Sequence, residues 1–141
     1  MPYKIRHLIL AFILLNTFES CCLGSKNISL GSGFKLSEYS FRETEIMYCL
    51  DNCCNSAYHV IPQTIVAYNF DPNWIIAKTD SSYYNGLNDF AYWIFKKNVF
   101  TTADMDSTIK ANLIGPLDSM KFYNILFEKN INLQLIPYSN K

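Results

Sequence analysis

Apolar and polar residues alternate in short runs along most of this chain, and that spacing predicts β-strands. The clearest pair is 64–70 and 74–78, two runs rich in β-branched and aromatic residues. Asp71-Pro72-Asn73 lies between them and is typical of a tight turn, so the two runs are expected to form a hairpin. Further strands are expected at 33–36, 45–50, 90–95, 99–100 and 131–137.

The spacing changes near the C-terminus, where a helix is predicted. Asp118 is expected to cap its N-terminus, and Leu117 to pack on Phe122 as a hydrophobic staple. Asn130 is expected to end it in the left-handed conformation. A shorter helix is predicted within 101–112. We therefore expect an α+β fold, in which an antiparallel β-meander of about five to seven strands carries the C-terminal α-helix on one face.

The N-terminus has a different pattern. Lys4 and Arg6 precede the apolar run Leu8–Leu15, which is too short to cross a membrane as a mature helix. Residues 1–20 are therefore interpreted as an export signal. The signal ends on a cysteine pair and not on an Ala-x-Ala site, which is typical of a bacterial lipoprotein.

The cysteine pair supplies the expected lipid anchor. Cys21 follows Ser20, and a small residue before the lipidated cysteine favours Cys21, with Cys22 as the alternative. An ordinary secretory signal with a chance cysteine pair is the other interpretation. The lipoprotein hypothesis places the protein in the bacterial cell envelope, outside the cytoplasm and held to the membrane by its N-terminal lipid. Residues 21–33 are then an anchor and polar tether, and 34–141 a single β-rich globular domain.

Three further cysteines, Cys49, Cys53 and Cys54, lie close together. Export exposes them to oxidising conditions, so we expect a disulfide from Cys49 to Cys53 or Cys54. Adjacent cysteines pair only with strain. A metal site made of these thiolates and His59 is the alternative, but their spacing fits no common zinc pattern. We expect no metal and no cofactor.

Charge and chemistry narrow the function classes. The chain has 12 basic and 12 acidic residues and no basic run, so nucleic acid is not expected as a partner. Paired acids occur as Glu43 with Glu45 and as Asp104 with Asp106, but each pair has an ordinary solvated explanation. His59, which lies outside the signal, resembles a strand residue. The chain is therefore expected not to be an enzyme.

Aromatic side chains remain as candidate binding residues, because exposed rings on a sheet bind sugars or protein partners. The alternative is that these rings fill both faces of a small sheet. The candidates are Tyr68, Trp74, Tyr83, Tyr84, Tyr92 and Trp93.

Three sequence segments carry a resemblance. The hairpin AYNFDPNWIIAK, the strand YWIFKK and the turn GPLD leading into a helix together resemble a family of small bacterial lipoproteins of unknown function. The similarity covers roughly residues 60–130. It implies the lipid anchor and the fold, and it implies no activity or catalytic residues.

The leading hypothesis is a non-enzymatic envelope lipoprotein whose domain binds an envelope protein or a glycan. A small hydrolase that uses Cys53 or Cys54 with His59 is the second hypothesis. A membrane-anchored inhibitor or immunity protein is the third.

Overall fold

The computed structural model describes residues 26–40, 43–61, 64–80, 89–97 and 104–139. Within these ranges, nine strands form two antiparallel sheets and are joined by two short helices, which confirms the expected α+β class. The sheets contain more strands than the five to seven predicted. The cysteine pair 21–22 and the expected strand 99–100 lie outside the described residues.

The first sheet has the strand order β1-β2-β3-β4 and the second has the order β8-β7-β6-β5-β9. The first sheet consists of β1 (Lys26–Gly31), β2 (Phe34–Ser40), β3 (Glu43–Cys49) and β4 (Ala57–Ile61). The second consists of β5 (Thr64–Phe70), β6 (Trp74–Asp80), β7 (Phe90–Lys96), β8 (Leu113–Leu117) and β9 (Ile136–Pro137). The helices are α3 (Met105–Asn112) and α4 (Ser119–Glu128).

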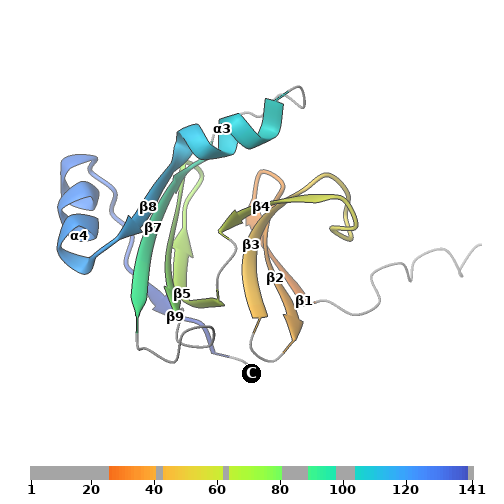
Figure 1. Cartoon of the computed structure of the whole chain (residues 1–141), viewed down its shortest axis with the longest axis horizontal. Helices are drawn as coiled ribbons and strands as arrows, with labels where there is room; N and C mark the ends of the chain where they lie inside the picture. The colour runs from red at the N-terminus through yellow and green to blue at the C-terminus, as the bar shows by residue number, and fades with distance from the viewer. Residues whose placement is uncertain (1–25, 41–42, 62–63, 81–88, 98–103, 140–141) are drawn as a thin grey trace, which may run out of the picture.

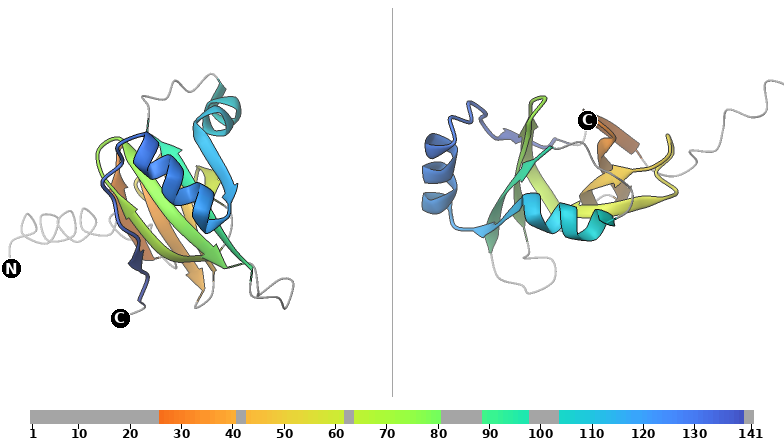
Figure 2. Two further views of the ribbon diagram at one scale, coloured as in Figure 1. Left: turned by 90° about the vertical axis from the view of Figure 1, so that its left-hand side faces the viewer. Right: turned by 90° about the horizontal axis from the view of Figure 1, so that it is seen from above.

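The elements are arranged in three layers. The second sheet lies between the first sheet and α4, and α3 lies across one end of the two sheets (Figure 1). Figure 2 shows the same order of layers from two further directions. The second sheet is therefore covered on both faces.

Two apolar cores separate these layers. The larger core lies between the sheets and is built from Leu30, Phe34, Leu36, Ile46, Val60, Ile61, Ile65, Ile75, Ala77, Trp93 and Phe95, with Ile109 of α3. The smaller core lies under α4 and contains Ile76, Ile94, Phe122, Leu126 and Ile131. Successive residues of a strand point to opposite faces, so Ile75 enters the first core and Ile76 the second. This explains why β6 and β7 are almost continuously apolar.

Polar side chains tie the two sheets together. The Thr44 hydroxyl in β3 donates to the Ile65 carbonyl and accepts from the Ile65 N–H in β5, both at 2.9 Å. The Tyr138 hydroxyl donates to the Glu38 carboxylate of β2 at 2.6 Å. Burial, followed by this bond, raises the pKa of Tyr138 to about 12, so its proton stays in place for donation.

Lys97 is a third link between the sheets. Its side chain is buried, and its Nζ donates to the Leu30 carbonyl of β1 and, at 2.6 Å, to the Asp71 carbonyl of the β5–β6 turn. The same Nζ lies 4.8 Å from the centre of the Phe70 ring. Loss of water around the amine lowers the pKa of Lys97, while Asp71 acts in the opposite direction. The lysine thus satisfies carbonyls from both sheets.

The expected tether is wrong for residues 26–33. Residues 26–31 form β1, which pairs with β2 and buries Leu30 completely. The Gly31-Ser32-Gly33 sequence is the turn between these strands, with φ angles of +82°, +55° and +83°. Glycine adopts such angles at little cost, so the Gly/Ser content marks a hairpin turn and not a flexible linker.

The C-terminal segment also differs from expectation. Within the predicted strand 131–137, ladder pairing is confined to Ile136–Pro137. Ile131, Leu133 and Leu135 instead pack against the core under α4. The alternation in this segment therefore reflects packing on the helix layer without strand pairing. The GPLD sequence, residues 115–118, was expected as a turn, but its first three residues belong to the edge strand β8, with a cis bond between Gly115 and Pro116.

Candidate functional site

The cysteine loop joins β3 to β4 and is closed by a disulfide between Cys49 and Cys54. This is one of the two pairings favoured from the sequence. Cys53 is disulfide-bonded as well, so it offers no thiolate to a substrate or metal.

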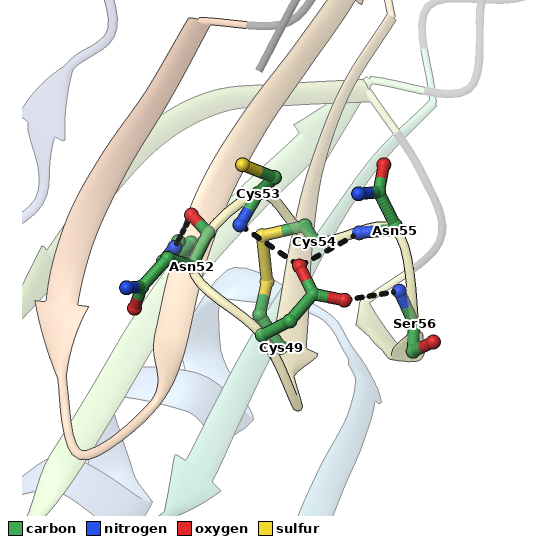
Figure 3. The surroundings of a disulfide bond; sticks show 8 residues. Cys49, Asn52, Cys53, Cys54, Asn55 and Ser56 are labelled. Atoms are coloured by element: carbon green, nitrogen blue, oxygen red, sulfur yellow. Dashed lines mark hydrogen bonds between the residues drawn. A yellow bond between two sulfur atoms is a disulfide. The ribbon is translucent and has the colours of Figure 1, made fainter. Parts of the chain in front are cut away.

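A single carboxylate organises the inside of this loop. Asp51 accepts from the backbone N–H groups of Ser56 at 2.8 Å, Asn55 at 3.1 Å and Cys53 at 2.8 Å (Figure 3). These bonds, the one from Ser56 most strongly, hold the pKa of Asp51 below its usual value. Lys35 of β2 donates to the Asn52 carbonyl at 2.5 Å and ties the loop to the sheet. The disulfide and these hydrogen bonds thus give the loop a structural role.

His59 lies against an acidic side chain. His59 Nδ1 of β4 lies 2.7 Å from Glu45 Oε2 of β3, and the histidine side chain is 62% exposed. Both residues project from the face of the first sheet that points away from the second sheet, because their neighbours Val60 and Ile46 lie in the core. An exposed side-chain contact of this kind contributes little to stability. The two thiols considered as its catalytic partner, those of Cys53 and Cys54, are both disulfide-bonded.

The remaining acidic candidates lie in solvent. Glu43 is exposed at the start of β3, on the same face as Glu45. Asp104 and Asp106 are exposed at the start of α3, where acidic groups favour the helix dipole. Within the described ranges, no group of three or more His, Cys, Asp or Glu residues is placed to hold a metal ion.

The aromatic candidates from the strands serve mainly as packing. Trp93 is buried between the sheets, and its Nε1 donates to the Thr79 hydroxyl at 3.0 Å. Tyr92 lies under α4 with its ring 5.0 Å from that of Phe122. Trp74 packs on the same core, and Tyr68 packs on the core between the sheets. Tyr83 and Tyr84 lie outside the described residues.

Three other apolar side chains are far more exposed, and sequence reasoning did not single them out. Met120, Tyr123 and Phe127 of α4 are 75%, 58% and 85% exposed. Their spacing of three and four residues places them on one side of the helix, which we call the α4 outer face. A different side of α4 buries Phe122 and Leu126 against the second sheet. The sequence did contain evidence for this exposed surface, because the apolar residues of α4 occupy more than one side of the helix.

The position of α4 is fixed at both ends. The Asp118 carboxylate accepts from the Lys121 N–H at 2.8 Å, which confirms the predicted N-cap. That hydrogen bond is the main reason why the pKa of Asp118 lies below its usual value. Asn130 has a φ of +52° and ends the helix as expected. Leu117 packs against the core that contains Phe122, in agreement with the expected staple.

In the part of the chain that the structure describes, no helix has the length and apolar content needed to cross a membrane. Comparisons of the chain with protein-family models, curated proteins and solved structures gave no match.

Proposed function

We propose that this protein is a lipid-anchored bacterial envelope protein whose domain acts as a non-enzymatic binding module, and that the α4 outer face is its binding surface. The observation that carries this proposal is the exposure of three large apolar side chains, Met120, Tyr123 and Phe127, on one side of one helix. Scattered single apolar residues are normal on protein surfaces, but a contiguous apolar stripe on one helix is typical of an interaction site.

The helix that carries the stripe is held rigid before any partner binds. Phe122 and Leu126 fix α4 to the second sheet, so the helix is a rigid support. The Tyr123 ring lies 5.1 Å from Phe122 and 6.5 Å from Tyr92, which restricts its movement. A partner therefore meets a rigid helix and, at Tyr123, a ring that loses little conformational freedom on binding.

The arrangement of layers supports the same surface. The described chain begins at Lys26 in β1, which belongs to the first sheet, whereas α4 lies beyond the second sheet (Figure 1). A lipid attached near residue 21 therefore joins the domain on the side away from α4. The α4 outer face is then presented away from the anchor, toward other envelope components.

A surface variant tests this function. On native gels of gently solubilised envelopes, the wild-type full-length protein should migrate as a complex larger than one chain. The variant with both Phe127→Ser and Tyr123→Ser should lose this high-mass species, while its circular dichroism and melting temperature stay close to those of the wild type. Phe90→Ser, which changes a 48% exposed ring at the start of β7, is the matched control and should retain that species. Equal migration of the wild type and the α4 variant at the mass of one chain would contradict a binding role for this face.

A further inference from the structure

The α4 outer face has features that fit a second copy of the same helix. We propose that this protein forms a homodimer in which α4 packs antiparallel on α4 of the other copy; this inference rests on the proposed function of that face. The two helices would be related by a twofold axis near Tyr123 and Asn124.

The apolar residues match one another in this arrangement. A twofold axis between positions 123 and 124 places Met120 of one copy opposite Phe127 of the other, and does so twice because the contact is symmetric. The two Tyr123 rings meet near the axis. A flexible thioether against a phenylalanine ring is a favourable contact. Each exposed side chain of the stripe thus meets an apolar partner.

The charges of the helix favour the antiparallel direction. Lys121 lies near the start of α4 and Glu128 at its end, and both are exposed. In the antiparallel pair, Lys121 faces position 126 of the other copy, two residues from Glu128, or about 3 Å along the axis. A parallel pair would instead place Lys121 beside Lys121. The helix dipoles also oppose each other when the helices are antiparallel.

The whole molecule does not resist self-association. The sequence has 12 basic and 12 acidic residues, and only Lys4, Arg6 and Glu19 of these lie in the expected signal, so the anchored protein is nearly neutral and two copies do not repel each other strongly at long range. The match of charges along α4 favours a second copy, and the absence of strong net repulsion permits it.

The size of the stripe sets the expected strength. Each aromatic side chain contributes on the order of 150–250 Å² when buried, so two rings and a methionine supply a few hundred Å² per copy. A standard stable interface buries about 800 Å² per partner. We therefore expect a weak dimer, with a dissociation constant of roughly 10–100 µM in solution. Confinement of lipid-anchored copies to one membrane raises their effective concentration.

Photo-crosslinking of the full-length protein in its own envelope tests the dimer. Benzoylphenylalanine in place of Phe127 should give, after illumination, a band of twice the chain mass in which the probe is joined to the peptide that contains Met120. The same probe in place of Phe90 is the control and should give no such band. A crosslink between the two 127 positions would contradict the antiparallel arrangement.

Charge exchange adds a specific check. Lys121→Glu alone should reduce the dimer crosslink several-fold, and Lys121→Glu combined with Glu128→Lys should restore it. Crosslinking of position 127 only to a different protein would overturn the dimer and leave the binding role of the α4 outer face standing. No crosslink from position 127 to any protein would overturn both.

Discussion

Replacement of Phe122 by alanine should separate the structural side of α4 from its exposed side. The Phe122 side chain is completely buried and lies in the core between α4 and the second sheet, with its ring 5.0 Å from that of Tyr92. Removal of a fully buried phenylalanine ring costs about 3–5 kcal/mol, because the transfer free energy is lost and a cavity remains. We therefore expect Phe122→Ala to lower the free energy of unfolding by this amount.

Phe127→Ala is the matched control, since it makes the same substitution five residues further along the same helix. Phe127 is 85% exposed, so the change in the free energy of unfolding should stay within about 0.5 kcal/mol. Urea titration followed by circular dichroism measures both. With a urea dependence of about 1–3 kcal/mol/M, Phe122→Ala should move the midpoint down by at least about 1 M. Equal midpoints for the two variants would refute the packing of α4 through Phe122.

Four further predictions test other parts of the structure. Lys97→Met should lower the free energy of unfolding by about 1.5–3 kcal/mol, because it leaves one buried and one partly buried carbonyl without their charged donor, whereas the exposed Lys96→Met should have little effect in the same urea titration. The pKa of Asp51 is lower in the folded chain than its usual value of 3.8, so its carboxylate adds stability above about pH 4, and this stability is lost as the pH falls through the folded-state pKa. Asp51→Asn should therefore be less stable than the wild type at pH 6, and its melting temperature should fall less steeply in acid. Mass spectrometry of non-reduced peptides should find Cys53 in a second disulfide and never alkylated before reduction. Radiolabelled fatty acid should enter the wild type and not Cys21→Ala; labelling that persists in this variant would move the anchor to the neighbouring cysteine, and no labelling of either form would exclude a lipid.

The β5–β6 hairpin could be predicted from the sequence because local chemistry determines it. Its strands are rich in β-branched residues, and the Asp71 carboxylate accepts from the N–H groups of Asn73 and Trp74, both at 2.7 Å. The N-cap of α4 was predictable for the same reason. In each case the residues that fix the element are neighbours along the chain.

Features that depend on distant contacts could not be predicted. Residues 26–31 look polar. They form a strand because the Leu30 side chain is covered by the second sheet and the Leu30 carbonyl accepts a hydrogen bond from Lys97. Similarly, Phe122 and Phe127 have the same side chain on the same helix. The second sheet decides which of them is buried, and no local pattern ranks them. The candidate site was therefore missed on the sequence and found from the fold.

The same limit applies to the aromatic candidates. Trp93 and Tyr92 lie next to each other on β7, and the sequence cannot show that both faces of this strand are covered. Once α4 is placed on the second sheet, Tyr92 becomes a packing residue and the exposed apolar surface moves to the helix. The interaction surface thus follows from the third layer of the fold.

Oxidative footprinting of Met120 tests the central claim most directly. Met120 is 75% exposed on the α4 outer face, and Met105 of α3 is buried, so the two methionines report on a candidate interface and on the core. Hydroxyl radicals should oxidise Met120 rapidly in the purified full-length protein at low concentration and several-fold more slowly in intact envelopes, with Met105 slow in both. Equal oxidation of Met120 in the two samples would show that nothing covers the α4 outer face and would contradict the binding function proposed for it.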